Sequence, residues 1–302
     1  MNDFYPGFEV FDISVGPEIA IHGVRGGSGP PLLLLHGFPQ THLIWHKVAP
    51  RLTSKFTTII IDIRGYGASS KPHVDYQKSP SDHKLYAKSA MAQDCATLMT
   101  MLGYGSFFVC GHDRGGRIAH KLCVDHPNRV RKCMVLDICP TKAMYEATNM
   151  GFAHAYFHWF FLTQPAPFPE KLLIGSPEVM PEKCFGTNAD ERFNREAVLD
   201  YKKQFSDWDA VHAMFEDYRA SMQEDIEESK ADISAGRMIK SPLLVLWGKK
   251  GVVQRYFDAK AEWERVCDPG LLDSKSCALD CGHYVPEEAP EDVIKHIEGF
   301  FQ

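Results

Sequence analysis

The sequence predicts an α/β fold: a mostly parallel sheet flanked by helices, with an inserted helical cap. Short apolar runs alternate with helical patterns, and continuous runs such as Leu32–Leu35 suit strands buried on both faces. Between about Pro140 and Ser241 this alternation stops, and aromatic residues and helix formers dominate without a convincing strand. The 302 residues, 44% of them apolar, suffice for one large core and an inserted subdomain.

The elements follow from the pattern in chain order. The predicted strands are Pro31–Leu35, Thr57–Asp62, Phe107–Cys110, Lys132–Asp137, Leu243–Trp247 and a short one near Ser276–Leu279. One helix is predicted to begin near Arg117, and two more to cover Leu199–Ala220 and Met222–Ile233. A last helix is predicted over Pro290–Phe301, because proline and acids fill its first turn. We therefore expect core residues 1–140, a cap over 141–240 and a second core part over 241–302.

Charge and cysteine content narrow the classes of partner. A net charge of −6 argues against nucleic acid and anionic membranes, so an anionic substrate would depend on local arginines. The segment Met1–Pro6 lacks a secretory pattern, and no apolar stretch approaches the roughly 20 residues of a membrane span. Nine cysteines without a Cys-x-x-Cys pair are typical of reduced thiols. We expect a cytoplasmic protein that acts on a small molecule.

The most informative motif is Gly111-His112-Asp113-Arg114-Gly115, which directly follows the apolar run Phe107–Cys110. A strand, a Gly-x-x-x-Gly turn and a helix make the nucleophile elbow of the α/β-hydrolase fold, which exposes its middle residue above the sheet. Here that residue is an aspartate instead of a serine. A carboxylate is already anionic at neutral pH and displaces leaving groups from sp³ carbon, leaving an ester. The motif therefore favours opening of carbon–halogen bonds or epoxides.

A histidine and a second acid should complete the catalytic group. His283 lies in a loop between the last strand and the closing helix, the position expected of the base. The usual acid position, after Trp247-Gly248, holds Gly251 instead. Asp137 ends a predicted strand within an apolar run, where an unpaired carboxylate would be costly to bury. We expect Asp137 to orient His283, and the alternative is a helix cap or loop carboxylate.

Two arginines distinguish this elbow. Arg114 and Arg117 are three residues apart near a helix N-terminus, so their side chains should share one face. Guanidinium groups bind carboxylates in a bidentate manner, and helix N-termini favour anions. We predict a clamp for a substrate carboxylate, and the alternative is ion pairing with Asp125 or Asp137.

At this point the chain resembles the haloacetate (fluoroacetate) dehalogenases of the α/β-hydrolase superfamily over nearly its full length. The motifs that carry the resemblance are Leu35–Thr41, Asp62–Gly67, Gly111–Arg117, Asp137–Thr141, His158–Pro165 and Asp217–Ala220. The resemblance implies Asp113 as nucleophile, His283 as base and Asp137 as its acid, with Arg114 and Arg117 holding the substrate carboxylate. It also implies that His158, Trp159 and Tyr218 bind the halide, as N–H and O–H donors can. The family would carry a bulky aromatic at Thr187.

These residues predict hydrolysis of fluoroacetate or chloroacetate to glycolate and halide through an aspartyl ester. The backbone N–H groups of Phe38 and Arg114 would bind the oxyanion. No metal or organic cofactor is expected, and a homodimer is expected only by resemblance.

Four alternatives are weaker. An epoxide hydrolase needs paired cap tyrosines, for which Tyr145, Tyr156, Tyr201 and Tyr218 are candidates, yet Arg114 does not suit a neutral epoxide. The same arginine disfavours a haloalkane dehalogenase. A noncatalytic relic would have lost a member of the triad, and none is lost. The His42/His46 and His154/His158 pairs have no third metal ligand at short range, so packing or surface roles are expected.

Overall fold

The computed structural model describes residues 4–302, apart from the side chain of Asp190; Met1–Asp3 of the N-terminal segment considered above lie outside the described residues. The sheet comprises β1 Glu9–Gly16, β2 Ile19–Gly27, β3 Pro31–Leu35, β4 Thr57–Ile61, β5 Phe107–His112, β6 Val130–Leu136, β7 Leu243–Gly248 and β8 Cys277–Leu279. Its strand order is β1-β2-β4-β3-β5-β6-β7-β8. Strand β2 pairs antiparallel with β1 and β4, and the other pairs are parallel. The predicted α/β class is confirmed.

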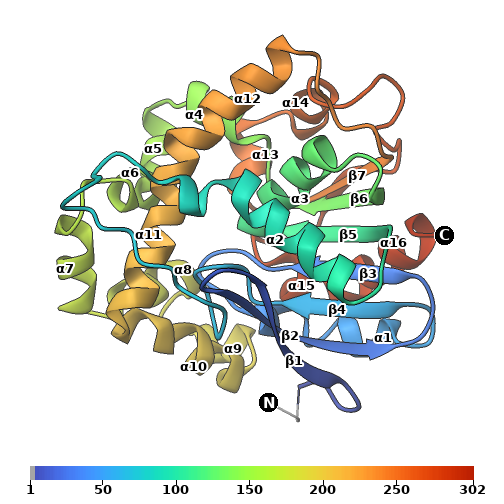
Figure 1. Cartoon of the computed structure of the whole chain (residues 1–302), viewed down its shortest axis with the longest axis horizontal. Helices are drawn as coiled ribbons and strands as arrows, with labels where there is room; N and C mark the ends of the chain where they lie inside the picture. Colours follow the sequence, from blue (N-terminus) through green and yellow to red (C-terminus); the bar gives the residue numbers. More distant parts are fainter. Residues whose placement is uncertain (1–3) are drawn as a thin grey trace.

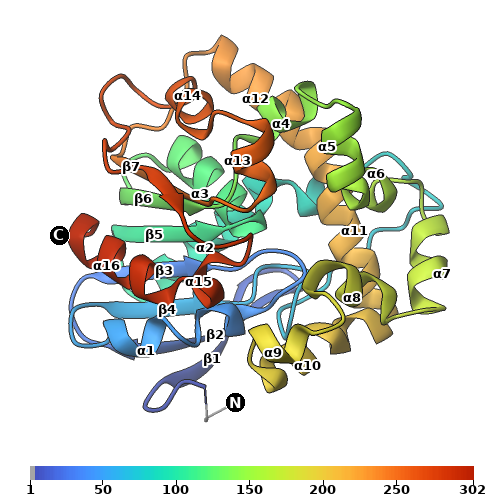
Figure 2. The same cartoon turned by 180° about the vertical axis from the view of Figure 1, so that it is seen from behind.

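Helices lie on both faces of this sheet and beyond one end of it (Figure 1; Figure 2). In the core they are α1 Ala49–Leu52, α2 Lys88–Met101, α3 Arg114–Asp125, α13 Val252–Tyr256, α14 Ala259–Glu264, α15 Val285–Glu288 and α16 Pro290–Phe300, with 3₁₀ turns η1 His42–Trp45 and η2 Lys84–Tyr86. Between β6 and β7 are α4 Thr141–Glu146, α5 Met150–Ala155, α6 Phe157–Leu162, α7 Phe168–Ile174, α8 Val179–Phe185, α9 Ala189–Arg192, α10 Arg195–Lys203, η3 Gln204–Ser206, α11 Trp208–Met222 and α12 Glu224–Ser234.

Alternation along the central strands explains why both faces are covered. In β3, Leu33 and Leu35 belong to a core cluster shared with α2 and α3, whereas Leu32 and Leu34 belong to a cluster shared with α1 and α16. All four leucines are fully buried. Because successive side chains of a strand point to opposite faces, an unbroken apolar run needs a helix layer on each side.

The helices of the insertion gather beyond one end of the sheet, and α11 runs through the middle of the group (Figure 1). Every residue of α11 from Ala210 to Ser221 is buried. The helix packs on α6, α7 and α12 within the insertion and on η2 of the core. This helix therefore joins the insertion to the core directly above the sheet end.

Three sequence expectations need correction. The helix after the elbow begins at Arg114, not near Arg117, because Asp113 already serves as its N-cap position. The predicted helix Leu199–Ala220 is interrupted: Asp207 has an extended backbone and its side chain accepts a hydrogen bond from the N–H of Asp209, which starts α11 anew. The β1–β2 hairpin was not predicted, since the edge strand β1 is largely exposed and has a weak apolar pattern.

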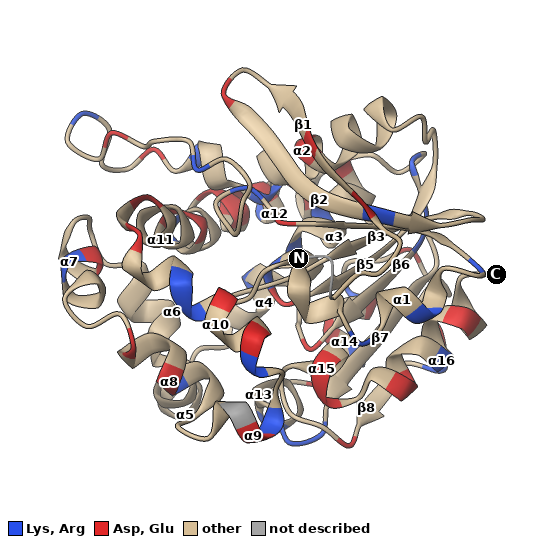
Figure 3. Ribbon diagram, turned by 90° about the horizontal axis from the view of Figure 1, so that it is seen from below, with Lys and Arg blue, Asp and Glu red and all other residues tan. Residues whose placement is uncertain are grey.

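Within residues 4–302, none of the helices has both the length and the apolar character that a membrane crossing requires. Acidic and basic residues are interspersed along core and cap (Figure 3). Charge therefore acts through local pairs, and the site below is described in those terms.

Candidate active site

The nucleophile elbow places Asp113 in a tight turn between β5 and α3. Asp113 has φ +47° and ψ −115°, a strained conformation for a residue with a side chain. A Cβ added at Gly111 would lie 2.3 Å from the carbonyl oxygen of Gly115, and one added at Gly115 would lie 2.4 Å from that of His36. Both flanking positions therefore require glycine, and the turn presents the Asp113 carboxylate at the carboxyl end of β5.

The two oxygens of this carboxylate have different surroundings. Oδ1 accepts a hydrogen bond of 2.9 Å from the backbone N–H of Phe38, and Oδ2 lies 4.0 Å from Nε2 of His283. Burial raises the pKa of Asp113, but the positive charges of His283, Arg114 and Arg117 outweigh it and hold the pKa below its ordinary value. The carboxylate is thus anionic at neutral pH, with one oxygen fixed and one unoccupied.

His283 is oriented by Asp137. Its Nδ1 lies 2.6 Å from Oδ2 of Asp137, whose Oδ1 accepts the backbone N–H of Gly248 at 2.8 Å. Burial lowers the pKa of His283, but the hydrogen bond and charge of Asp137, together with Asp113, raise it above its ordinary value. Asp137 is 2% exposed and has φ +50°, so the backbone at the end of β6 is bent to deliver this carboxylate. The arrangement leaves Nε2 facing Asp113.

Gly251 explains why the acid lies after β6. A Cβ added at Gly251 would lie 3.3 Å and 3.4 Å from the two carboxylate oxygens of Asp137. The position after β7 therefore borders the space that Asp137 fills, and an aspartate there would place two carboxylates in contact. Only one of the two positions can hold the acid without repulsion.

A cavity of about 250 Å³ opens above Asp113 between core and insertion. Its lining combines the nucleophile and His283 with aromatic cap residues and three basic side chains toward solvent. The lining residues are Phe38, Asp113, Ala155, Tyr156, His158, Trp159, Lys183, Cys184, Tyr218, Lys250, Gly251, Val252, Arg255, His283 and Tyr284. This volume suits a small substrate.

Arg114 is fully buried and faces α11. Its Nε and Nη2 each donate a 2.8 Å hydrogen bond to the Asp217 carboxylate, and Nη2 also donates to Ser221 Oγ. Within residues 4–302, Nη1 is buried without a hydrogen-bond partner. The expected alternative partners are engaged elsewhere: Asp125 pairs with Lys121 and Asp137 with His283. Arg114 thus has a partner that was not predicted, and one donor left over.

Arg117 has no ion-pair partner among the side chains that the structure describes. Its Nη1 donates to Thr141 Oγ1 at 2.6 Å, and Nη2 lies 3.4 Å from Met144 Sδ. Nε is buried without a partner within the same residues. Burial and the charge of Arg114 lower the pKa of Arg117. A buried cation beside another cation is costly, and a bound anion would relieve the cost.

Aromatic rings separate both arginines from the cavity. The Arg114 guanidinium lies 4.2 Å from the ring centroid of Tyr218, and that of Arg117 lies 4.6 Å from the Trp159 ring. Both rings line the cavity, whereas neither arginine does. An anion would therefore have to reach the inner end of the cavity, past these rings, to meet the two unpartnered N–H groups.

Three donors from the cap reach the cavity wall. His158, Trp159 and Tyr218 line it, and none of the three side chains has a hydrogen-bond partner within the described part of the chain. Burial lowers the pKa of His158 to about 3, so the imidazole is neutral. The Phe38 ring packs against His158 and Tyr218, with centroids 6.1 Å and 5.3 Å away. The imidazole, indole and phenol groups can thus donate to a ligand.

Comparison with known proteins identifies the architecture. A protein-family model described as the α/β hydrolase fold matches residues 30–290 of the sequence. The chain belongs to the α/β-hydrolase family. It is 40% identical to a fluoroacetate dehalogenase from Burkholderia sp., over 98% of this chain and 94% of that protein, which confirms the resemblance seen in the sequence. It is also 29% identical to a soluble epoxide hydrolase from Corynebacterium sp. (strain C12), over 93% of each chain.

A solved structure from Nostoc sp PCC 7120, described as an α/β hydrolase, superimposes with a TM-score of 0.90 at 44% identity, covering 98% of each chain. Asp113 lies at the elbow, Asp137 at the end of β6 and His283 in the loop after β8, which is the chain order that this fold uses for a nucleophile, an acid and a histidine.

Some cap residues that the sequence analysis singled out do not line the cavity. Thr187 is exposed and is not among the cavity-lining residues, so its small side chain does not enlarge the site. Of the four candidate tyrosines, Tyr156 and Tyr218 line the cavity. The Tyr201 hydroxyl instead lies 3.4 Å from Glu287, and the Tyr145 hydroxyl is buried without a partner in the described residues.

Two site features were missed from the sequence. Asp217 stood in a quoted motif, but its pairing with Arg114 was not predicted; the available signal was an acid in the middle of an apolar helix. His112 stood in the elbow motif without an assigned role, yet its Nε2 lies 2.8 Å from the carbonyl oxygen of His283, and burial lowers its pKa to about 3. Neutral His112 thus supports the loop that carries His283.

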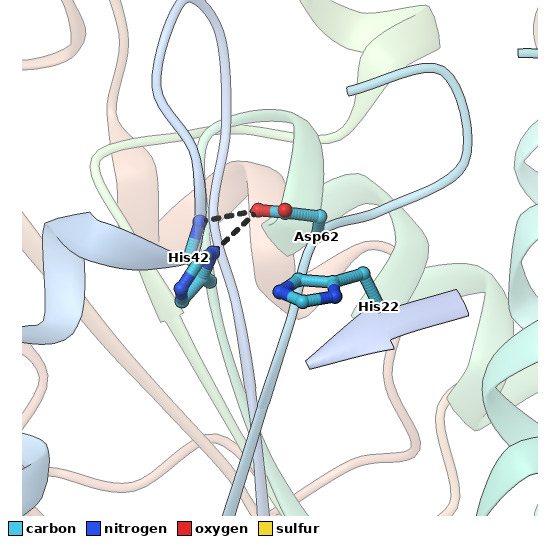
Figure 4. Close-up of side chains that lie close together, drawn as sticks. All are labelled: His22, His42 and Asp62. Atoms are coloured by element: carbon cyan, nitrogen blue, oxygen red, sulfur yellow. Dashed lines mark hydrogen bonds and ion pairs between the residues drawn. The ribbon is translucent and has the colours of Figure 1, made fainter. Parts of the chain in front are cut away.

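A second cluster of ligand-type side chains, His22, His42 and Asp62, lies outside this cavity (Figure 4). Oδ1 of Asp62 accepts both the backbone N–H and Nδ1 of His42, at 2.7 Å and 2.9 Å, and Oδ2 accepts the N–H of Ala68 at 2.9 Å. These contacts anchor the loop after β4 to η1. Within residues 4–302, the Nε2 atoms of His22 and His42 are buried without a hydrogen-bond partner. The structure thus brings two further ligand-type side chains to His42, which the sequence analysis did not expect.

Proposed function

We propose that this α/β hydrolase removes halide from haloacetates, converting fluoroacetate or chloroacetate to glycolate through a covalent ester on Asp113. The observation that carries the proposal is the pair of buried donor nitrogens without a partner in the described residues, Arg114 Nη1 and Arg117 Nε, beside an anionic elbow aspartate. A small carboxylate is the ligand that would satisfy both. The 40% identity to a fluoroacetate dehalogenase over 98% of the chain supports the same substrate class.

In the first step the substrate carboxylate binds Arg114 Nη1 and Arg117 Nε, which presents the halogenated carbon to Asp113. Oδ1 is held by the Phe38 N–H, so Oδ2 is the attacking oxygen. It forms a bond to carbon as the carbon–halogen bond breaks, and the halide takes the electron pair. His158, Trp159 and Tyr218 would solvate the departing ion with N–H and O–H donors.

In the second step water hydrolyses the ester. His283, oriented by Asp137, takes a proton from a water molecule that lies to one side of the line between its Nε2 and Oδ2 of Asp113, which are 4.0 Å apart. The hydroxide adds to the carbonyl carbon of the ester, whose oxygen becomes an oxyanion bound by the N–H groups of Phe38 and Arg114. Collapse breaks the bond between Cγ and Oδ2, and glycolate leaves with Oδ2 and takes the proton from His283. Asp113 is restored with one oxygen from water.

The main alternative is an epoxide hydrolase. Two tyrosines, Tyr156 and Tyr218, line the cavity and could protonate an opening epoxide, and an epoxide hydrolase is among the relatives. A neutral epoxide would leave Arg117 without a counter-ion, which disfavours this reading.

The test measures fluoride and chloride release from fluoroacetate and chloroacetate, beside diol formation from a small epoxide. Halide release that Asp113→Asn abolishes is expected. Diol formation without halide release would overturn the proposal. A single turnover in heavy-oxygen water should label Asp113; label that goes directly into glycolate would exclude the ester.

We also infer a cytoplasmic location, supported by nine cysteines that are all free thiols. A homodimer stays a prediction, to be measured by light scattering.

A further inference from the structure

Asp217 is a completely buried carboxylate in α11 that binds several core residues at once. One edge receives the Arg114 guanidinium, with Nε on Oδ2 and Nη2 on Oδ1. Lys88 Nζ donates to Oδ1, and the Tyr66 hydroxyl donates to Oδ2 at 2.8 Å. All four of these side chains are buried. A single cap carboxylate thus organises donors from α2, α3 and the loop after β4.

These contacts fix the orientation of Arg114. Its Nη2 is held further by the backbone carbonyl of Asp217, at 2.7 Å, and by Ser221, whose hydroxyl donates to Asp225 at 2.8 Å. The flat face of the guanidinium lies on the Tyr218 ring. With one edge and one face occupied, rotation about the last side-chain bonds is blocked, and Nη1 is the donor that stays unpartnered.

We propose that Asp217 is the positioning residue that makes this enzyme select anionic over neutral substrates, by holding Arg114 with only its Nη1 amino group free for a carboxylate. The inference rests on the proposed function and adds the cap residue that governs substrate charge. Asp217 acts through Arg114, since Asp217 pairs with Arg114 and is itself not among the cavity-lining residues.

The charge balance of the cluster explains the selection. Arg114, Arg117 and Lys88 bring three buried cations, and Asp217 brings one anion to two of them. Lys88 has a second partner in Asp225, at 3.3 Å. Arg117 has no direct ion-pair partner among the described side chains, and the Asp113 carboxylate acts on it only as a nearby charge. The cluster therefore keeps one cation without a bound partner. A substrate carboxylate compensates it, whereas an amide of the same shape leaves it in place.

The experiment compares kcat/KM for chloroacetate and for its neutral isostere chloroacetamide. Chloride released by Asp113→Asn is measured in parallel and subtracted, because it comes from alkylation of cysteine thiols. Asp217→Asn keeps the shape but removes the charge that holds Arg114. We expect kcat/KM for chloroacetate to fall about 10- to 100-fold, mainly through KM, as for loss of a charge-assisted hydrogen bond. The value for chloroacetamide should change by less than about threefold, so the selectivity ratio falls.

Two further variants separate positioning from folding. Asp217→Asn with Lys88→Met removes one charge of each sign and keeps the cluster balanced, in case the single variant does not fold. Glu216→Gln is the matched control: it is an equally buried carboxylate of the same helix, but it binds Arg219 and His83. The double variant should lose selectivity, and the control should keep the wild-type ratio. A proportional loss on both substrates in the Asp217 variants would overturn the inference.

Acetate binding to wild type, measured by calorimetry, distinguishes the inference from the proposed function. Absence of halide release in an enzyme that binds acetate would refute the proposed reaction alone. Acetate binding that Asp217→Asn leaves unchanged would refute the positioning role alone.

Discussion

Asp113 and His283 differ in which protonation state the proposed chemistry needs. Asp113 must be anionic to attack, and nearby positive charge favours that state despite burial. His283 must be neutral to accept a proton from water, yet Asp137 and Asp113 favour its cation. Acid therefore slows hydrolysis of the ester, because it protonates His283, whereas the attack by Asp113 does not need this base.

Replacement of the nucleophile should stop the reaction with little effect on folding. Asp113→Asn keeps the shape and the Phe38 contact but removes the negative charge, and we expect halide release to fall at least about a thousandfold. Ion chromatography of the released halide measures this loss. Acetate binding serves as the control, since the amide leaves both arginines in place; activity within about tenfold of wild type would contradict the assignment.

The pH dependence should report His283. Because its pKa is raised above the ordinary value, the fraction of neutral imidazole falls as pH falls through that raised value, and kcat should decline on the acid side with it. Rates of chloride release across the acid and neutral range measure the midpoint. A midpoint below the ordinary histidine value would show that another group controls the step.

His283→Gln should separate the two halves of the reaction. Attack by Asp113 does not need the base, so the ester forms and persists. Mass spectrometry of the intact protein after exposure to chloroacetate should then show one added carboxymethyl group, located on Asp113. Unmodified protein together with a first-turnover burst of chloride would contradict the scheme.

Turns that end strands decide where the catalytic groups lie. The β5–α3 turn needs glycine at two positions, the end of β6 gives Asp137 a positive φ, and the β7–α13 turn leaves space beside Asp137 through Gly251. The backbone of these turns thus fixes where the carboxylates of Asp113 and Asp137 lie.

The acid should be transferable between two of these turns. Asp137→Ala should abolish ester hydrolysis, and Asp137→Ala with Gly251→Asp should restore part of it, since Gly251 has an extended backbone (φ −86°) and its Cβ position lies 3.3 Å from the lost oxygen. Steady-state chloride release tests this recovery. Gly251→Asp alone should lower activity, because two carboxylates would crowd; normal activity of that single variant would contradict the argument.

Local sequence patterns were sufficient to predict strands whose residues are buried along their whole length. The run Pro31–Leu35 was predicted with the bounds that the structure has, because every face of it is covered. The edge strand Glu9–Gly16 was missed, since its exposure removes the apolar signal. The Asp217–Arg114 pair could not be predicted, because it joins α11 to α3 across 103 residues and depends on how the cap settles on the core. Local periodicity contains no such information.

At the scale of the whole molecule, one buried acid away from the cavity should control stability. Glu287 is 2% exposed, it accepts a hydrogen bond from Gln40, and burial raises its pKa to about 8. The unfolded chain loses this proton near the ordinary value of about 4.5, so the folded state binds the extra proton between the two values. The free energy of unfolding must therefore fall as the pH rises through that window.

Glu287→Gln should remove this dependence. Wild type should lose roughly 2.5 kcal/mol of unfolding free energy between about pH 5.5 and about pH 7.5 from this group alone, and the variant should lose correspondingly less. Urea unfolding at both pH values gives the two slopes. Parallel slopes for the two proteins would show that Glu287 ionises normally in the folded state.

The Asp217 cluster also has a mechanical consequence. Arg114, Lys88 and Tyr66 belong to the core, and Asp217 belongs to the insertion, so lifting α11 would expose a carboxylate and separate it from two cations. That motion is too costly to accompany each turnover. We therefore expect the cap to stay seated on the core during turnover. Substrate and products would then pass the exposed basic side chains of the cavity lining, Lys183, Lys250 and Arg255.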